Sequence, residues 1–330
     1  MNSGNTTERR LELAIRHGCL LIPKDPNEKR RLDYRLARGI VCMPFPGAYT
    51  LIESFNKLDP RVQARMMLKA PHTLHPGWTF CLFSAAVAHG LQVPQELLSR
   101  THVAISPSES RRKHLGQVAC HIDKGGGGHV LADNIPCTTL MQTTLDCLCA
   151  STFRQGLAIV DSVLHHRLAT KEQLIEYFAA HGKGRRGIRQ ARETLKYADG
   201  RSENGGESIV RAVIIELGFE TPELQIEIED PMMPGVSKRA DLGWKLSDGR
   251  YILAELDGFA KYLTKGARRS KVEKTELAVQ SMRAERLRKS HLNLTGAVIL
   301  RFSFAQALDT SYFFQLLATA GVPLAGERTL

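Results

Sequence analysis

Acidic side chains interrupt two apolar segments in the last third of the chain. Asp241 stands inside ADLGW, which otherwise resembles a core strand, and Glu255 and Asp257 end the apolar run YILAELD. Burying carboxylates near strand ends is costly unless a cation neutralises them. One or two Mg²⁺ or Mn²⁺ ions held by carboxylates can generate hydroxide from water and stabilise the leaving oxygen of a phosphodiester. The pattern therefore predicts metal-dependent phosphodiester hydrolysis, with Mg²⁺ (or Mn²⁺) as cofactor.

Two further side chains could complete such a site. Lys261 follows the acidic strand after a short turn and could orient the attacking water or offset charge on the pentacoordinate phosphorus. Glu207, in the helical segment GGESIVRAVIIELGF, could reach the same cluster. We expect catalysis to depend on Glu207, Asp241, Glu255, Asp257 and Lys261, with Asp241, Glu255 and Asp257 as the metal ligands.

Each acidic residue also has an explanation that needs no metal. Glu207 could pair with Arg211 one helical turn further on, a contact worth about 0.2–0.5 kcal/mol. Asp257 could simply begin an Asp-Gly turn, and Asp241 could form an ion pair with Arg239 at a strand edge. All three explanations would have to hold while the carboxylates also follow the order of a nuclease site, so we favour the shared site.

The elements expected around these residues follow the order helix, strand, strand, strand, helix, strand. LQIEIED, RADLGWKL and YILAELDG have the composition of strands, and GAVILRFSF predicts the last one. Between YILAELDG and GAVILRFSF, the segment VEKTELAVQSMRAERLRKS predicts a basic helix. The window 259–301 carries eleven Lys or Arg against three Glu. Such one-sided charge indicates a surface for phosphates, and the helix would contribute Lys274, Arg283, Arg286, Arg288 and Lys289.

The first 75 residues predict a DNA-binding module. ERRLELAIRHG and EKRRLDYRLARG predict helices, and two β-rich runs flank PFPG, so helix, turn, helix and hairpin follow in the order of a winged helix-turn-helix. In that arrangement the second helix enters the major groove. Its basic side chains would then face phosphates or base edges: Lys29, Arg30, Arg31, Arg35 and Arg38. The alternative is an amphipathic helix whose basic face is only solvated.

Three domains are expected in this α+β multidomain chain. They are a winged-helix-like domain at 1–75, a mixed α/β middle domain at 76–200 and an α/β nuclease-like domain at 201–330. The middle domain should contain a buried helix in TFCLFSAAVAHGLQVP, strands at THVAI and QVACHI, and helices from LMQTTLDCLCAS onward. HGKGRRGIRQARETLKYADGRSENGG, basic and then rich in Gly, Ser and Asn, predicts a linker or boundary near residue 200.

The last part of the chain resembles a known nuclease superfamily. Glu207-Ser208, RADLGW, ELDGFAKY, the basic helix and VILRFSF together resemble PD-(D/E)xK nucleases, in particular domains related to very-short-patch repair endonucleases, over residues 203–310. The resemblance implies a restriction-endonuclease-like fold, with Asp241 and Glu255 as metal-binding acids and Glu207 as the helix glutamate. The superfamily places lysine two residues after the strand glutamate. This chain has Asp257 there, and Lys261 would substitute.

The first two thirds of the chain resembles the AbiEi family of antitoxins and regulators of type IV toxin-antitoxin systems. The likeness lies in the basic helix before RLARGIVCMPFPGAYT, in FSAAVAHGL and in TTLMQTTLDCLCA. Where relatives often have an Arg-Thr pair leading to Asp, this chain has Gln142, Thr143 and Asp146. AbiEi-like segments fused to nuclease-like domains form a recurring bacterial architecture. The resemblance implies a DNA-binding regulator and a cognate toxin as partner.

Two functions compete on these observations. The chain is either a Mg²⁺-dependent DNA endonuclease or a non-catalytic DNA-binding regulator that keeps the nuclease fold as a second DNA-binding surface. RNA binding is a third reading, and the 6% aromatic content offers few stacking platforms for it. The net charge of +11 agrees with a polyanionic partner. With no signal-like start and no apolar run of ~20 residues, we expect a cytoplasmic protein that binds double-stranded DNA, without a membrane partner or a small-molecule cofactor.

Overall fold

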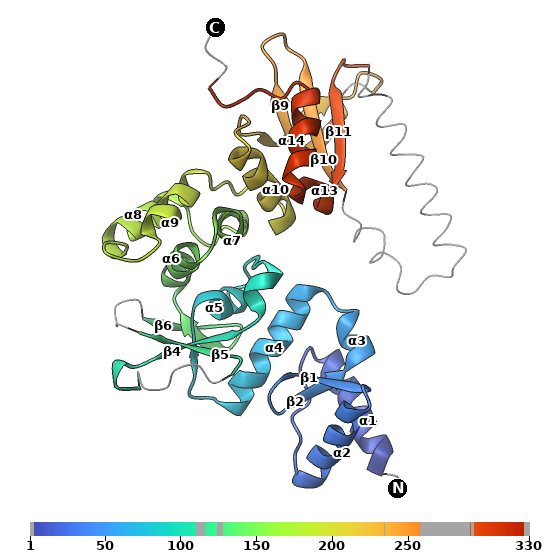
Figure 1. The fold of residues 1–330 in the computed structure, drawn as a ribbon, viewed down its shortest axis with the longest axis vertical. Helices are drawn as coiled ribbons and strands as arrows, with labels where there is room; N and C mark the ends of the chain where they lie inside the picture. The colour runs from blue at the N-terminus through green and yellow to red at the C-terminus, as the bar shows by residue number, and fades with distance from the viewer. Residues whose placement is uncertain are drawn as a thin grey trace, which may run out of the picture. The chain divides into compact units, whose positions relative to one another are not determined.

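The computed structural model describes residues 3–109, 116–123, 128–233, 235–257, 291 and 294–326. The chain forms two compact units (Figure 1). Unit 1 comprises Met1–Val163 with Leu168–Lys196, and unit 2 comprises Leu164–Arg167 with Tyr197–Leu330. Both contain helices and sheets, so the chain is an α+β protein. The expected separation of residues 1–75 from 76–200 stays a prediction, because residues 1–75 and most of 76–200 belong to unit 1.

Unit 1 begins with two helices and a hairpin, in the order that the sequence predicts. These are α1 (Ser3–Arg16), α2 (Pro26–Ala37), β1 (Val41–Phe45) and β2 (Ala48–Leu51). Asp25 accepts a hydrogen bond from Glu28 N and Pro26 opens the helix, which fixes the start of α2. The strands pair antiparallel around Gly47 at φ +82°. A small core fills the space between helices and hairpin: Leu11, Leu21, Leu32, Val41 and Tyr49.

Two helices that the sequence analysis did not anticipate follow the hairpin. They are α3 (Ile52–Asn56) and α4 (Pro60–Leu74). Asp59 caps α4 by accepting a hydrogen bond from Arg61 N, and the helix buries Ala64, Met66, Leu68 and Ala70. An N-cap aspartate followed by proline is a strong start signal.

A five-stranded sheet in the order β5-β4-β3-β7-β6 forms the middle of unit 1. Its strands are β3 (Thr79–Phe80), β4 (Thr101–Ile105), β5 (Val118–Ile122), β6 (His129–Ala132) and β7 (Ile135–Thr138). The accompanying elements are α5 (Leu82–Ala88), η1 (Gln95–Leu98), η2 (Pro107–Glu109), α6 (Leu140–Ala150), α7 (Phe153–His165), α8 (Lys171–His181) and α9 (Ile188–Lys196). The expected strands at THVAI and QVACHI and the helices after Pro136 are present.

Helix α9 lies within the segment HGKGRRGIRQARETLKYADGRSENGG, for which the sequence predicted a linker or boundary near residue 200. Residues 188–196 form a helix instead of a linker, and the two units divide after Lys196. Ala191, Thr194 and Leu195 are buried along one face of it. Their spacing of one and three residues matches the helical repeat, and burial of this face outweighs the high polarity of the segment.

Unit 2 is a four-stranded sheet covered by helices. Its elements are α10 (Gly205–Glu216), β8 (Glu223–Glu229), β9 (Ser237–Lys245), β10 (Tyr251–Asp257), β11 (Val298–Ser303), α13 (Phe304–Leu308) and α14 (Thr310–Thr319). The sheet order is β11-β10-β9-β8. β8, β9 and β10 pair antiparallel, whereas β10 and β11 are parallel. The expected basic helix between β10 and β11 lies outside the described residues.

The main core of unit 2 joins the sheet to α10, α13 and α14, and Figure 1 shows α13 and α14 alongside β11. Trp244 is 2% exposed, and its indole N–H donates to the carbonyl of Glu220 at 2.8 Å. The expected last strand GAVILRFSF ends earlier, at Ser303. Ser303 and Gln306 form a capping box, so Phe304 begins α13 instead of continuing the strand.

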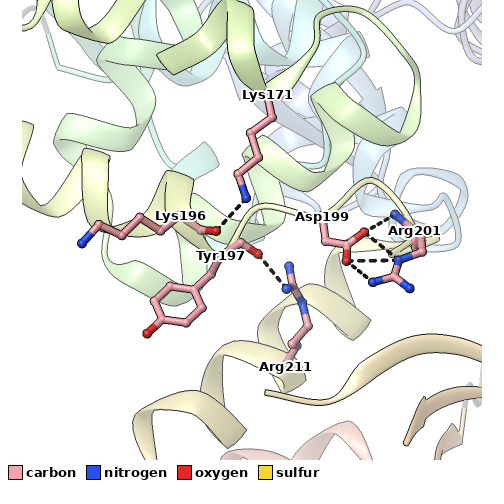
Figure 2. Close-up of polar contacts among 6 residues, drawn as sticks. All are labelled: Lys171, Lys196, Tyr197, Asp199, Arg201 and Arg211. Carbon is pink, nitrogen blue, oxygen red and sulfur yellow. Dashed lines mark hydrogen bonds and ion pairs between the residues drawn. The ribbon is translucent and has the colours of Figure 1, made fainter. Parts of the chain in front are cut away.

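The chain passes from unit 1 to unit 2 between Lys196 and Tyr197. A cationic side chain donates a hydrogen bond to the backbone carbonyl of each of these two residues (Figure 2). Within unit 1, Lys171 Nζ donates to the carbonyl of Lys196 at 2.6 Å. Within unit 2, Arg211 Nη1 donates to the carbonyl of Tyr197 at 2.7 Å. Nearby, burial alone would raise the pKa of Asp199, but hydrogen bonds from Arg201 outweigh it and hold that pKa below its ordinary value.

Among the helices of the described ranges, none combines the length and the apolar character needed to cross a bilayer.

Candidate functional site

Asp241 and Glu255 lie on adjacent antiparallel strands. The register of β9 and β10, continued one step beyond its last pair, places these two residues opposite each other. Asp241 Oδ2 accepts a hydrogen bond from the backbone N–H of Leu256 at 3.0 Å. The carboxylate of β9 therefore reaches the backbone of β10 between Glu255 and Asp257.

The start of α10 lies beside the same end of β10. A Cβ atom built on Gly206 would lie 3.5 Å from Leu256 Cδ2, which brings the neighbouring Glu207 close to β10. Glu207 is 2% exposed. Its carboxylate accepts hydrogen bonds from the backbone N–H of Glu203 and from the side chain of Asn204, which caps α10. Glu207 thus orders the start of the helix.

Gln225 on β8 is a candidate that the sequence analysis missed. The register of β8 and β9 places it opposite Asp241. Its φ of +55° is left-handed, which is costly for a residue other than glycine. Gln225 Nε2 lies 3.4 Å from Glu207 Oε2, and its Oε1 is buried without a hydrogen-bond partner among the described residues. Strain and an unsatisfied buried oxygen beside acidic residues are typical of functional sites.

Arg301 on β11 is the second candidate that was missed. It is the register partner of Glu255 across the parallel strands. Arg301 Nη2 lies 2.6 Å from Glu255 Oε2, and Glu255 is only 9% exposed. A carboxylate at this burial needs a compensating charge. Arg301 supplies it through a charge-assisted hydrogen bond.

The donor chemistry of Asp241 and Glu255 fits magnesium. Mg²⁺ prefers oxygen ligands and is commonly held by one or two carboxylates, completing its shell with water and phosphate oxygens. In the ranges that the structure describes, no group of three or more His, Cys, Asp or Glu side chains could hold a metal ion. Binding of Mg²⁺ by Asp241 and Glu255 therefore stays a prediction, and a cation would compete with Arg301 for Glu255.

Asp257 is exposed at the end of β10, where its register partner on β11 is Ser303. Its expected role as a metal ligand stays a prediction. The other basic residues predicted for this site lie outside the described residues: Lys261, Lys274, Arg283, Arg286, Arg288 and Lys289.

Some of the basic residues of α2 are engaged with acidic side chains. Lys29 Nζ lies 2.7 Å from Asp33 Oδ2, and Arg35 Nη2 lies 3.7 Å from Glu8 Oε2. The hydrogen bond from Lys29, followed by one from Tyr49, lowers the pKa of Asp33 below its ordinary value. Asp33 therefore stays ionised near neutral pH and continues to hold Lys29.

The other basic residues in this part of the chain differ in exposure. Arg38, just after α2, places its guanidinium over the ring of Tyr34 at 4.4 Å from the centroid. Arg31 is half-buried and Arg30 is exposed. Arg30 and Arg38 are thus the exposed members of the predicted set that form no ion pair within the described chain.

Comparison with known proteins shows limited similarity. No family model and no solved structure matches the chain. Two uncharacterized proteins of Mycobacterium tuberculosis, one from each of two strains, are 40% identical to it over 90 residues, which is 27% of this chain and 32% of theirs. The chain thus spans about a third of the length of these curated relatives. Their names state no activity, ligand or partner.

Proposed function

We propose that this protein binds double-stranded DNA and that unit 2 is a magnesium-dependent DNA endonuclease domain. The observation that carries the proposal is the 3.0 Å hydrogen bond from Leu256 N to Asp241 Oδ2, because it brings the β9 carboxylate to the place where Glu255 and Asp257 end β10. The order α10, β8, β9, β10, β11, with a parallel β10/β11 pair, supports it, since this is the order that the resemblance to PD-(D/E)xK nucleases implies.

The residues of the site have different tasks in this proposal. Asp241 and Glu255 would hold the ion, which when bound supplies a nucleophilic hydroxide and shields the scissile phosphate. Gln225, with its amide next to Glu207, links the start of α10 to the sheet. Arg301 holds the carboxylate of Glu255 in position before substrate arrives.

Plasmid nicking in Mg²⁺ or Mn²⁺ tests the proposal. The full chain should nick supercoiled DNA, and Asp241→Asn/Glu255→Gln should lower the rate by about 100-fold or more, as loss of groups that stabilise the transition state does. Asp248→Asn/Glu227→Gln changes the same residue types at exposed positions of unit 2 and should nick like the wild type. Equal nicking by the site variant, or a wild type that never nicks, contradicts the proposal.

One observation favours a second function. Arg301 neutralises Glu255, as expected for a nuclease fold that binds DNA without hydrolysing it. Such a protein would be a DNA-binding regulator, with a cognate toxin as partner if the AbiEi resemblance holds. Retention of DNA in a binding assay, without nicking in either metal, would support the regulator over the endonuclease.

A further inference from the structure

Residues 183–192, here called the α9 basic surface, connect α8 to α9 and form the first turns of α9. Their sequence KGRRGIRQAR contains five Lys or Arg and no acidic residue. Lys183, Arg186, Arg189 and Arg192 are exposed. All ten positions belong to the described chain, and none is an exposed large apolar side chain. The segment is therefore a strongly cationic surface without an apolar centre.

The fifth cation of the segment anchors it to α6. Arg185 Nη1 forms an ion pair with Asp146 Oδ1. The same oxygen accepts a hydrogen bond from Gln142 Nε2 at 2.8 Å, and Tyr177 on α8 donates its hydroxyl to Gln142 Oε1 at 3.1 Å. Gln142 and Asp146, which stand where AbiEi relatives often have Arg and Asp, thus tie the segment to two helices.

Two glycines pack the same segment tightly against its neighbours. A Cβ atom on Gly187, whose φ is +84°, would lie 2.0 Å from the carbonyl oxygen of Cys149. A Cβ atom on Gly182 would lie 2.4 Å from the carbonyl oxygen of Phe178. No side chain fits at either position without backbone movement. The loop before α9 therefore packs closely against α6 and α8, and a loop ordered in this way loses less entropy on binding.

The exposed cations lack acidic partners. Within the described chain, Lys183, Arg186 and Arg189 form no ion pair, and Arg192 donates to the carbonyl of Phe178 at 3.3 Å. A polyanion that replaces the counterions around such a cluster gains the entropy of their release. The buried centre of a protein–protein interface is typically depleted of charge and enriched in apolar and aromatic side chains, and residues 183–192 expose no large apolar side chain. The chemistry favours a phosphate backbone.

We propose that the α9 basic surface binds the phosphate backbone of double-stranded DNA, as a contact separate from α2 and from the carboxylates of unit 2. The choice of DNA rests on the proposed function, whereas the affinity for phosphates rests on the charges and the anchoring of this surface. The contact is independent of base sequence, because Lys and Arg on phosphates position a duplex without reading it.

Fluorescence anisotropy with a labelled DNA duplex, at several salt concentrations, tests the contact in the full chain. Lys183→Gln/Arg186→Gln/Arg189→Gln should weaken binding about tenfold or more and reduce the slope of log K against log salt by about 2–3, at ~0.9 for each lost phosphate contact. Lys57→Gln/Arg61→Gln/Arg100→Gln removes the same charge at exposed positions elsewhere in unit 1. It should change the slope far less. Thermal melting of both variants should match the wild type.

The outcomes separate this inference from the proposed function. A wild type that binds no duplex DNA overturns both. If the wild type binds duplex DNA but the two triple variants have the same affinity and the same salt slope, the result overturns the α9 contact. It does not contradict DNA binding by the protein. A wild type that binds an RNA duplex in preference to DNA, with the same loss in the α9 variant, overturns the choice of DNA.

Discussion

Residues 29–38 and residues 183–192 carry the same number of basic side chains, five each, but differ in the partners of those charges. In the first segment Lys29 is held by Asp33 and Arg38 covers Tyr34. In the second, one arginine is bound by Asp146 and the other cations face solvent. The count of charges in a sequence therefore does not say how many are available to a ligand.

The largest effect is expected from the backbone that holds the α9 basic surface. Gly187→Ala places a Cβ atom 2.0 Å from the carbonyl oxygen of Cys149 and adds left-handed strain of about 1–3 kcal/mol. We expect a loss of stability well above that strain, measured by chemical denaturation. Gly184→Ala is the matched control, because its φ is +73° with no atom within 4 Å. Similar stability of the two variants would show that the loop yields easily.

A weaker effect is expected from neutralising the first segment. Lys29→Gln/Arg30→Gln/Arg38→Gln removes three charges, but two of them are already engaged. The salt dependence of duplex binding should therefore fall by only about one phosphate contact, ~0.9 in slope, against two to three for the α9 variant. If the salt slope changes more in the α2 variant than in the α9 variant, α2 is the principal DNA contact and the comparison between the two segments is reversed.

Removing the charge of Asp146, which anchors Arg185, should have a moderate effect on stability and on DNA dissociation. Asp146→Asn breaks a partly buried ion pair, so we expect a loss of about 1 kcal/mol in stability and faster dissociation of DNA. Amide hydrogen exchange at residues 182–188 should rise. Glu193→Gln breaks the exposed pair with Lys196 and serves as the control. Unchanged exchange in Asp146→Asn would show that the two glycines alone hold the loop.

The smallest effect is expected from releasing Lys29. Asp33→Asn removes its acidic partner and should strengthen duplex binding slightly, with a gain of up to about 0.9 in salt slope. Because the folded pKa of Asp33 is depressed, its ionised form contributes stability above the ordinary pKa, and the contribution is lost only as pH falls through the depressed value. The difference in stability between Asp33→Asn and the wild type should thus stay constant from about pH 5 to 8. A difference that varies across this range would mean that another group controls Lys29.

The parts of the fold that depend on local pattern could be predicted. The composition of LQIEIED and RADLGWKL located β8 and β9, and the two β-rich runs that flank PFPG located the hairpin. The end of β11 could not be located in this way, because Phe304 suits a strand and only the Ser303–Gln306 capping box turns it into a helix. The helical face of α9 was hidden by the polarity of its sequence.

The residues of the candidate site likewise divide into those that the sequence could predict and those that it could not. Carboxylates in apolar segments stand out in a sequence, so Asp241 and Glu255 could be chosen. Arg301 could not be assigned to Glu255, because their pairing depends on the register of two parallel strands separated by a long crossover. Gln225 gave no signal, since glutamine is ordinary on the polar side of an alternating strand and its backbone angle is a tertiary property.

Gln225 has a consequence for engineering the molecule. A glycine at φ +55° would avoid most of the strain that this position stores, so Gln225→Gly should leave thermal stability unchanged or raise it. The same change removes the amide that reaches Glu207. A search for thermostable variants would therefore select against this side chain, and the thermostability gained would come at the expense of the region where the acidic residues gather.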